Sequence, residues 1–80
     1  MVKVLFFATL KDKAGTRQTE FDLPAGTTIA QLKRLVAEKY PGLGGMLGHC
    51  LASVNHSYRA DESEIPADAE VAFFPPVSGG

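Results

Sequence analysis

Apolar and polar positions along the chain follow the period of strands in some segments and the period of a helix in one. Residues 2–9, VKVLFFAT, are rich in Val and Phe, which suit a pleated surface, and they predict a first strand. Val4 and Phe6 fall on one face of this strand and Phe7 on the other, so both faces are apolar. We therefore expect a strand at the centre of a sheet, or one whose second face meets another surface.

A turn and a returning strand are predicted next. Residues 11–15, KDKAG, predict a turn in which Gly15 can take a positive φ. Residues 16–23, TRQTEFDL, predict the return strand of a hairpin, with Thr19 and Phe21 on the same side.

A helix is predicted to begin after Thr28 and to end near Tyr40. Thr28 and Gln31 have the spacing of a capping box, in which each side chain bonds the backbone N–H of the other residue. Pro41-Gly42 stops the helix. Apolar residues recur at helical spacing and should cover one face of the sheet: Ile29, Leu32, Leu35, Val36 and Tyr40. Polar residues are expected on the opposite face: Lys33, Arg34 and Glu38.

The second half of the chain predicts short strands separated by loops. Residues 42–49, GLGGMLGH, are glycine-rich and predict a loop. Strands are predicted at residues 50–55, at the edge segment 57–59 and at residues 70–74, with a turn at Asn55-His56. The order β-β-α-β-(β)-β, with one main helix packed on one face of a mixed sheet, is an α+β roll. The first and last strands are the most apolar, so we expect them to lie side by side and parallel at the centre.

Composition limits the classes of function. The chain has 80 residues and is 45% hydrophobic, which is typical of one small domain. Its single cysteine excludes an internal disulfide and indicates a reducing, cytoplasmic setting. No apolar run approaches the roughly 20 residues of a membrane helix, so no membrane association is expected. The net charge of −1 argues against a nucleic-acid partner.

Charge is divided unevenly between the two halves. Residues 1–40 hold seven Lys and Arg against four acids, and residues 41–80 hold one Arg against five acids, which gives +3 and −4. One interpretation is an ordinary solvated surface. The other is that the acidic half attracts basic partners toward the chain end that it carries.

Internal residues offer little catalytic chemistry. His49 and Cys50 are adjacent, and adjacent residues of a strand point to opposite faces, so they cannot easily form a catalytic pair. Adding His56 gives no recognised metal-ligand spacing, and we expect no metal site. A lone cysteine on a strand is usually a small core residue. A polar loop holds a carboxylate cluster that we expect to be solvated: Asp61, Glu62 and Glu64.

The last residues, FFPPVSGG, have a different character. We expect residues 1–74 to form the domain and residues 75–80 an extended tail. Pro75-Pro76 cannot continue a sheet and favour an extended path. Gly79-Gly80 has no side chains, so it can enter a narrow channel and present a terminal carboxylate, which can be activated as an acyl-adenylate.

Three stretches carry a family resemblance: VKVLFFA at the start, ASVN in the third predicted strand, and DAEVAFFPPVSGG at the end. Together they resemble the small subunits of molybdopterin synthase, which are ubiquitin-like β-grasp sulfur carriers. The resemblance extends over the whole chain. Ala69 stands where the family usually has Asp, a departure that affects a turn and not the chemistry.

The resemblance implies a mechanism and two partners. An adenylyltransferase uses ATP to activate the Gly80 carboxylate, which carries AMP transiently, and sulfur then replaces one oxygen to give a thiocarboxylate. No permanently bound cofactor is expected. The tail then enters the large synthase subunit of a heterotetramer, which supplies the catalytic residues, so this chain is a non-catalytic sulfur donor. The residues expected to insert are Pro75, Pro76, Val77, Ser78 and Gly79.

A partner interface is expected on the sheet face opposite the helix, formed by Leu5, Phe7, Ala72 and Phe74. The alternative is that loop residues such as Met46 or Leu47 close this face. Other functions also stay open: a sulfur carrier for thiamine synthesis or tRNA thiolation, a plain ubiquitin-like interaction module, and a small enzyme that uses His49 or Cys50.

Overall fold

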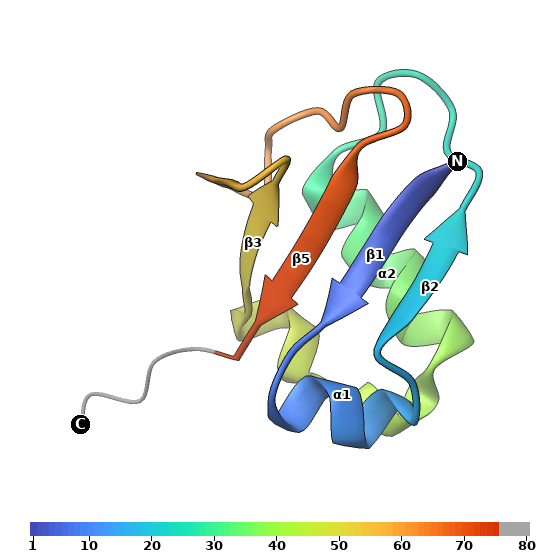
Figure 1. The fold of residues 1–80 in the computed structure, drawn as a ribbon, viewed down its shortest axis with the longest axis vertical. Helices are drawn as coiled ribbons and strands as arrows, with labels where there is room; N and C mark the ends of the chain where they lie inside the picture. Colours follow the sequence, from blue (N-terminus) through green and yellow to red (C-terminus); the bar gives the residue numbers. More distant parts are fainter. Residues whose placement is uncertain (76–80) are drawn as a thin grey trace.

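The computed structural model describes residues 1–75. Figure 1 shows the strands side by side, with α2 crossing behind them and α1 below their lower ends. The elements in chain order are β1 (Val2–Phe6), α1 (Thr9–Ala14), β2 (Gln18–Phe21), α2 (Ile29–Lys39), the 3-10 helices η1 (Pro41–Leu43) and η2 (Met46–His49), β3 (Leu51–Val54), β4 (Ser57–Arg59) and β5 (Glu70–Phe74). None of the helices within residues 1–75 combines the length and the apolar character that crossing a membrane requires.

The sheet has five strands in the order β2-β1-β5-β3-β4. β1 and β5 are parallel, with Leu5 opposite Ala72 and Phe6 opposite Phe73, while the other neighbours are antiparallel. The predicted α+β roll and the predicted parallel pair at its centre are therefore confirmed. Because β1 and β5 run in the same direction, the end of β1 and the end of β5 lie at the same edge of the sheet (Figure 1).

The connection between β1 and β2 is a helix, and the prediction of a hairpin turn is wrong. β1 ends at Phe6 rather than at Thr9, and α1 occupies residues 9–14. Leu10, the one fully buried residue of α1, explains the difference, because a helical turn places its side chain in the core. Gly15 ends the helix with φ 79°, a left-handed conformation that favours glycine.

The N-terminus of α2 has the predicted capping box. The backbone N–H of Gln31 donates to the Thr28 hydroxyl, and the backbone N–H of Thr28 donates to the Gln31 side chain. The loop before β5 satisfies two more N–H groups of the first turn, which donate to the carbonyls of Ser63 and Asp61. The polar loop is therefore part of the helix cap.

Two residues of α2 lie on the opposite face from the one predicted. Leu35, expected to be buried, is 38% exposed, and Lys33, expected on the solvent face, is 7% exposed. The Lys33 ammonium donates to the Cys50 carbonyl at 3.0 Å and pairs with Asp61 at 2.9 Å. A buried ammonium with two such partners is satisfied, so Lys33 can lie on the buried face of α2.

The glycine-rich segment after α2 closes the core on the helix side of the sheet. It forms η1 and η2 rather than an irregular loop. Leu43 and Leu47 are buried in the same cluster as the inward residues of β1, α2 and β5, and Met46 packs against that cluster.

Candidate functional site

The base of the predicted tail lies where the two central strands end. β5 ends at Phe74, and the half-buried Pro75 is the last described residue. The predicted reactive residue Gly80 and four residues expected to insert lie outside the described residues: Pro76, Val77, Ser78 and Gly79. The site that the structure does describe is therefore the surface from which this segment continues.

Two phenylalanine rings join the end of β1 to the end of β5. Phe7 directly follows β1, and its ring stacks on the ring of Phe74 with centroids 4.9 Å apart and an angle of 9° between the planes. Tyr58 of β4 approaches Phe74 from the other side, with centroids 6.1 Å apart. The last strand residue before the tail is thus held between aromatic side chains on two other segments.

These rings belong to a larger apolar area on the sheet face away from α2, which we call the open-face patch. Its members are Leu5, Phe7, Leu51, Tyr58, Ala72 and Phe74. Phe7 is 41% exposed, Leu51 45% and Tyr58 69%. Leu5 and Phe74 are half-buried, and Ala72 is 7% exposed, so it contributes little to the accessible surface of the patch. Exposed apolar side chains grouped in this way usually mark a surface that another molecule covers.

The structure brings the four predicted interface residues together and adds two. The registers place Leu5 beside Ala72 and Leu51 beside Phe74. Met46 and Leu47, the residues expected to close this face under the alternative, pack in the core on the helix side instead. Leu51 could have been found from the alternation in β3, where Ala52 and Val54 point inward. Tyr58 could have been found from the predicted turn at Asn55-His56, because a two-residue turn places Tyr58 opposite Ser53, on the same face as Leu51.

Cys50 and the two histidines do not form a site. The Cys50 thiol is buried and donates to the Met46 carbonyl at 3.1 Å. Burial raises the pKa of this thiol, and the nearby Lys33 opposes the shift. His49 is exposed, and His56 lies 3.7 Å from a Glu70 oxygen. Among residues 1–75, no three His, Cys, Asp or Glu side chains are placed to hold a metal ion.

The acidic residues of the second half lie at both ends of the sheet, and the expectation that they draw basic partners toward the tail stays a prediction. Asp61 pairs with Lys33, whose ammonium binds the Cys50 carbonyl. Cys50 directly precedes Leu51, the partner of Phe74 in the sheet, so Asp61 lies toward the tail end of β5.

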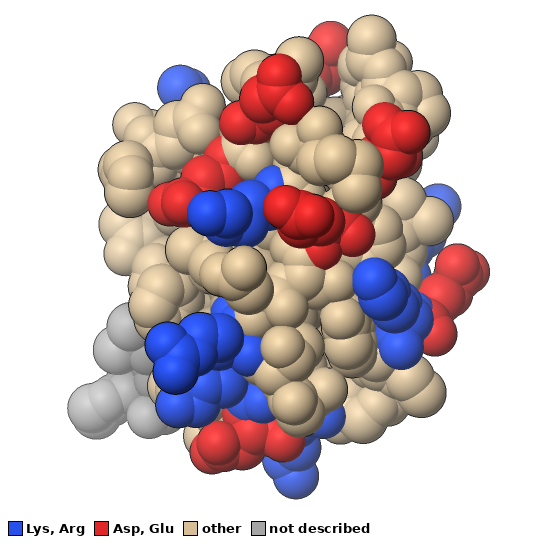
Figure 2. Space-filling view, turned by 45° about the vertical axis from the view of Figure 1, so that its right-hand side comes forward, with Lys and Arg blue, Asp and Glu red and all other residues tan. Residues whose placement is uncertain are grey.

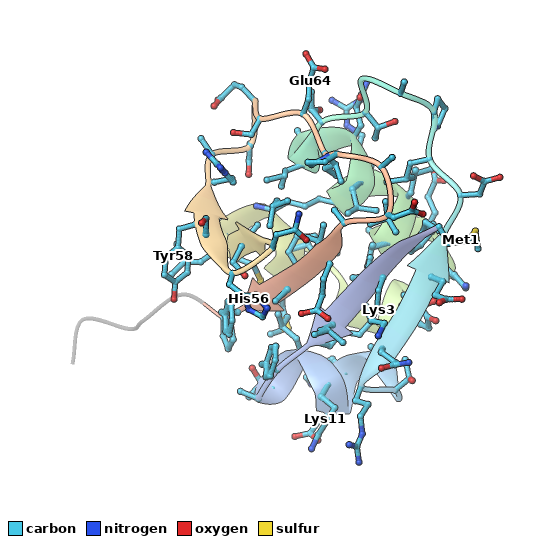
Figure 3. The ribbon with its side chains drawn as sticks, turned by 45° about the horizontal axis from the view of Figure 1, so that its top comes forward. Met1, Lys3, Lys11, His56, Tyr58 and Glu64 are labelled. Carbon is cyan, nitrogen blue, oxygen red and sulfur yellow. The ribbon has the colours of Figure 1, made fainter. Side chains whose placement is uncertain are left out.

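Asp68, in contrast, pairs with the Met1 ammonium at 2.9 Å, which places this residue at the start of β1. The tail leaves from the other end of β5, roughly 13 Å away at about 3.3 Å per residue. Figure 2 shows the acidic side chains mostly in the upper part of the visible face and the basic ones mostly in the lower part. In Figure 3, Glu64 and Lys11 lie at opposite ends of the molecule.

Known proteins resemble the chain over its full length. A family model described as the ThiS family matches residues 4–80. The molybdopterin synthase sulfur carrier subunit of Escherichia coli K12 is 37% identical over 82 residues, covering 100% of both chains. The protein of the same name from Caenorhabditis briggsae is 36% identical over 81 residues, covering 99% of this chain and 96% of the relative. The crystal structure of SAMP1 from Haloferax volcanii superposes with a TM-score of 0.86 at 26% identity, covering 99% of this chain and 98% of that one.

Proposed function

The chain belongs to the ThiS family, and from this premise we propose that it is a sulfur carrier subunit of molybdopterin synthase. The shared fold bears out the predicted β-grasp arrangement of a mixed sheet with one main helix on one face. The observation that carries the proposal beyond family membership is the open-face patch, because it surrounds the base of the predicted tail. A carrier whose last residue enters a partner needs a binding surface at that position.

The chemistry of the proposal resides in the Gly80 carboxylate. An adenylyltransferase attacks the α-phosphate of ATP with this carboxylate, which releases pyrophosphate and leaves an acyl-adenylate. A sulfide donor attacks the acyl carbon, AMP leaves, and a thiocarboxylate remains. Thiocarboxylate sulfur is a strong nucleophile at neutral pH, so the charged chain donates sulfur to a pterin precursor, and hydrolysis regenerates the acid. AMP is thus a transient group, and the chain binds no permanent cofactor.

The partners follow from the division of labour. The relatives are named as subunits of a synthase, which supports a larger subunit as the partner of this chain. We assign the catalytic groups to that subunit, because the described residues bring no nucleophile and base together. The open-face patch docks on the larger subunit, residues 75–80 enter it, and two carriers and two large subunits form a heterotetramer in the cytoplasm.

Intact-mass spectrometry tests the proposal. The purified chain is incubated with ATP, a sulfide donor and the cognate adenylyltransferase, and we expect a mass gain equal to exchange of one oxygen for sulfur. A chain lacking Gly80 should gain nothing, while Cys50→Ser should gain as much as the wild type. Persulfide formation on Cys50 would instead add a whole sulfur atom. An unchanged mass with an active enzyme present, or a gain that depends on Cys50, contradicts the proposal.

The identity of the acceptor separates this function from the related alternatives. The charged chain should transfer its sulfur when the large subunit of molybdopterin synthase and the pterin precursor are added. If a thiamine-pathway or tRNA-thiolation enzyme accepts the sulfur and the large subunit does not, the chain serves that pathway. If the wild type is never charged with sulfur, and a chain without Gly80 binds its partner as well as the wild type does, a plain interaction module is favoured.

A further inference from the structure

Basic side chains lie next to the tail base, on the segment that follows β1. Lys11 and Lys13 belong to α1 and Arg17 precedes β2, and all three side chains are exposed. Asp12 is the one carboxylate among them, so the segment carries +2 from three cations and one acid. Figure 3 shows Lys11 at the end of the molecule opposite Glu64.

Lys11 and Arg17 line a hollow that borders the open-face patch. The lining residues are Leu5, Phe6, Phe7, Ala8, Lys11 and Arg17. Leu5 and Phe7 are members of the patch, and Phe7 stacks on Phe74, so the hollow continues the apolar surface toward the base of the tail. The lining of this hollow therefore combines apolar residues with two positive charges.

The cations have no carboxylate to neutralise them within the described part of the chain. Three ion pairs occur in residues 1–75, Met1–Asp68, Lys33–Asp61 and His56–Glu70, and none involves Lys11, Lys13 or Arg17. Lys11 and Lys13 lie in the last turn of α1, where the helix dipole stabilises positive charge. Arg17 lies outside the helix, so the helix dipole does not stabilise its charge in this way.

We propose that Lys11 and Arg17 form a docking site for carboxylates on the protein surface that receives the tail. The inference rests on the proposed function, and it names the charge of the partner: acidic around the entrance of the channel, with an apolar rim beside it for Phe7 and Phe74. Charges at the rim of an interface act mainly on the rate of encounter and on the choice of partner. The site therefore guides the tail end of the carrier toward the entrance.

Association kinetics with the cognate large subunit of molybdopterin synthase test this inference. The double variant Lys11→Gln/Arg17→Gln removes two positive charges from the hollow. Arg34→Glu changes the net charge by the same −2 at an exposed position of α2, on the other side of the sheet. Rates are measured at 0.1 M and 1 M ionic strength, where the Debye length falls from about 10 Å to about 3 Å.

At 0.1 M we expect the double variant to associate about 3–10-fold more slowly than wild type, because steering by charged surfaces has at least this size. Arg34→Glu should change the rate by less than about twofold, and at 1 M all three rates should converge. Equal rates for the double variant and wild type, equal losses in both variants, or faster association of the double variant overturn the inference and leave the proposed function standing. Failure of the wild type to bind the large subunit contradicts the proposed function instead.

Discussion

The rings of Phe7 and Phe74 lie nearly parallel, 4.9 Å apart, although 67 positions separate the two residues. The parallel pairing of β1 with β5 produces this contact, because it brings the end of the first strand and the end of the last strand to one edge of the sheet. Phe7 thereby fixes the ring that directly precedes Pro75. The last residue of β5 is therefore held by a contact with the residue that follows β1.

Truncation of Phe73 should destabilise the fold much more than truncation of Phe74. Phe73 is completely buried, so Phe73→Ala should lower the free energy of unfolding by about 3–5 kcal/mol. Phe74 is half-buried and loses a stacked pair, so Phe74→Ala should cost about 0.5–1.5 kcal/mol. Urea unfolding followed by circular dichroism measures both values.

Truncation of Phe74 should weaken binding to the large subunit more than it weakens the fold. Phe74→Ala should weaken the affinity by more than about 2 kcal/mol, which is the loss typical of a central interface aromatic. Tyr58→Ala, at the margin of the open-face patch, is the matched control and should weaken it less. Titration calorimetry gives the affinities, and a Phe74→Ala protein that binds like wild type would remove Phe74 from the interface.

The Cys50 thiol should be unreactive in the folded protein. Burial raises the pKa of this thiol and removes access to it, so alkylation by iodoacetamide at pH 8 should be at least about tenfold slower than in urea. The unfolded chain loses its thiol proton at a lower pH than the folded chain does. The contribution of the protonated Cys50 thiol to the free energy of unfolding is therefore complete below about pH 8.5 and declines above that pH.

The variant Cys50→Ala isolates that contribution. The difference in unfolding free energy between wild type and the variant should shrink as the pH is raised from 7 to 10. A difference that grows with pH would show that the folded state favours the thiolate. Rapid alkylation of the native protein would reopen a chemical role for Cys50.

The strands and the capping box were predictable because each depends on residues close together in sequence. Alternating Val and Phe define β1, and Thr28 and Gln31 define the start of α2. α1 escaped prediction because a helix of six residues with one buried apolar side chain has no visible period. Its formation depends on the core that receives Leu10, which the sequence pattern does not display.

The position of the candidate site was predictable in part. Period-two alternation placed Leu5 and Phe7 together, and the parallel pairing added Ala72 and Phe74. The charge around the site was not predictable from the two halves of the chain, because a division by sequence ignores strand direction. β5 begins near Asp68, which pairs with the Met1 ammonium, and ends at Phe74, which stacks on Phe7 next to the segment that carries Lys11.

The pair formed by Lys33 and Asp61 should stabilise the loop before β5. Lys33 has an 8% exposed side chain and Asp61 a 47% exposed one, so removing the acid leaves a buried ammonium with the Cys50 carbonyl as its remaining partner. Asp61→Asn should cost about 1–3 kcal/mol of unfolding free energy, the range for a lost hydrogen bond to a charged group. Glu62→Gln, in the same loop, should cost less than about 0.5 kcal/mol, the range for ordinary surface positions.

A double-mutant cycle checks that this loss comes from the pair. Lys33→Met removes the buried charge itself, so a second change at Asp61 should then cost little. Additive losses in the double variant would show that Asp61 acts on the helix cap through its backbone neighbours and not through Lys33. Chemical denaturation of the four proteins at one pH supplies the comparison.

Gly42 should be intolerant of even one added carbon. A Cβ at this position would lie 2.5 Å from the Lys13 carbonyl oxygen, a backbone atom at the end of α1 that cannot rotate away. Gly42→Ala should therefore separate η1 from α1 and lower the unfolding free energy by about 1–3 kcal/mol, as overpacking does. Gly45→Ala is the matched control, because its Cβ meets nothing within 4 Å and its φ of −86° suits alanine.

Because α1 carries Lys11, the same Gly42→Ala protein should also associate more slowly with the large subunit at 0.1 M ionic strength. Equal stabilities of the two alanine variants would mean that α1 moves freely against η1.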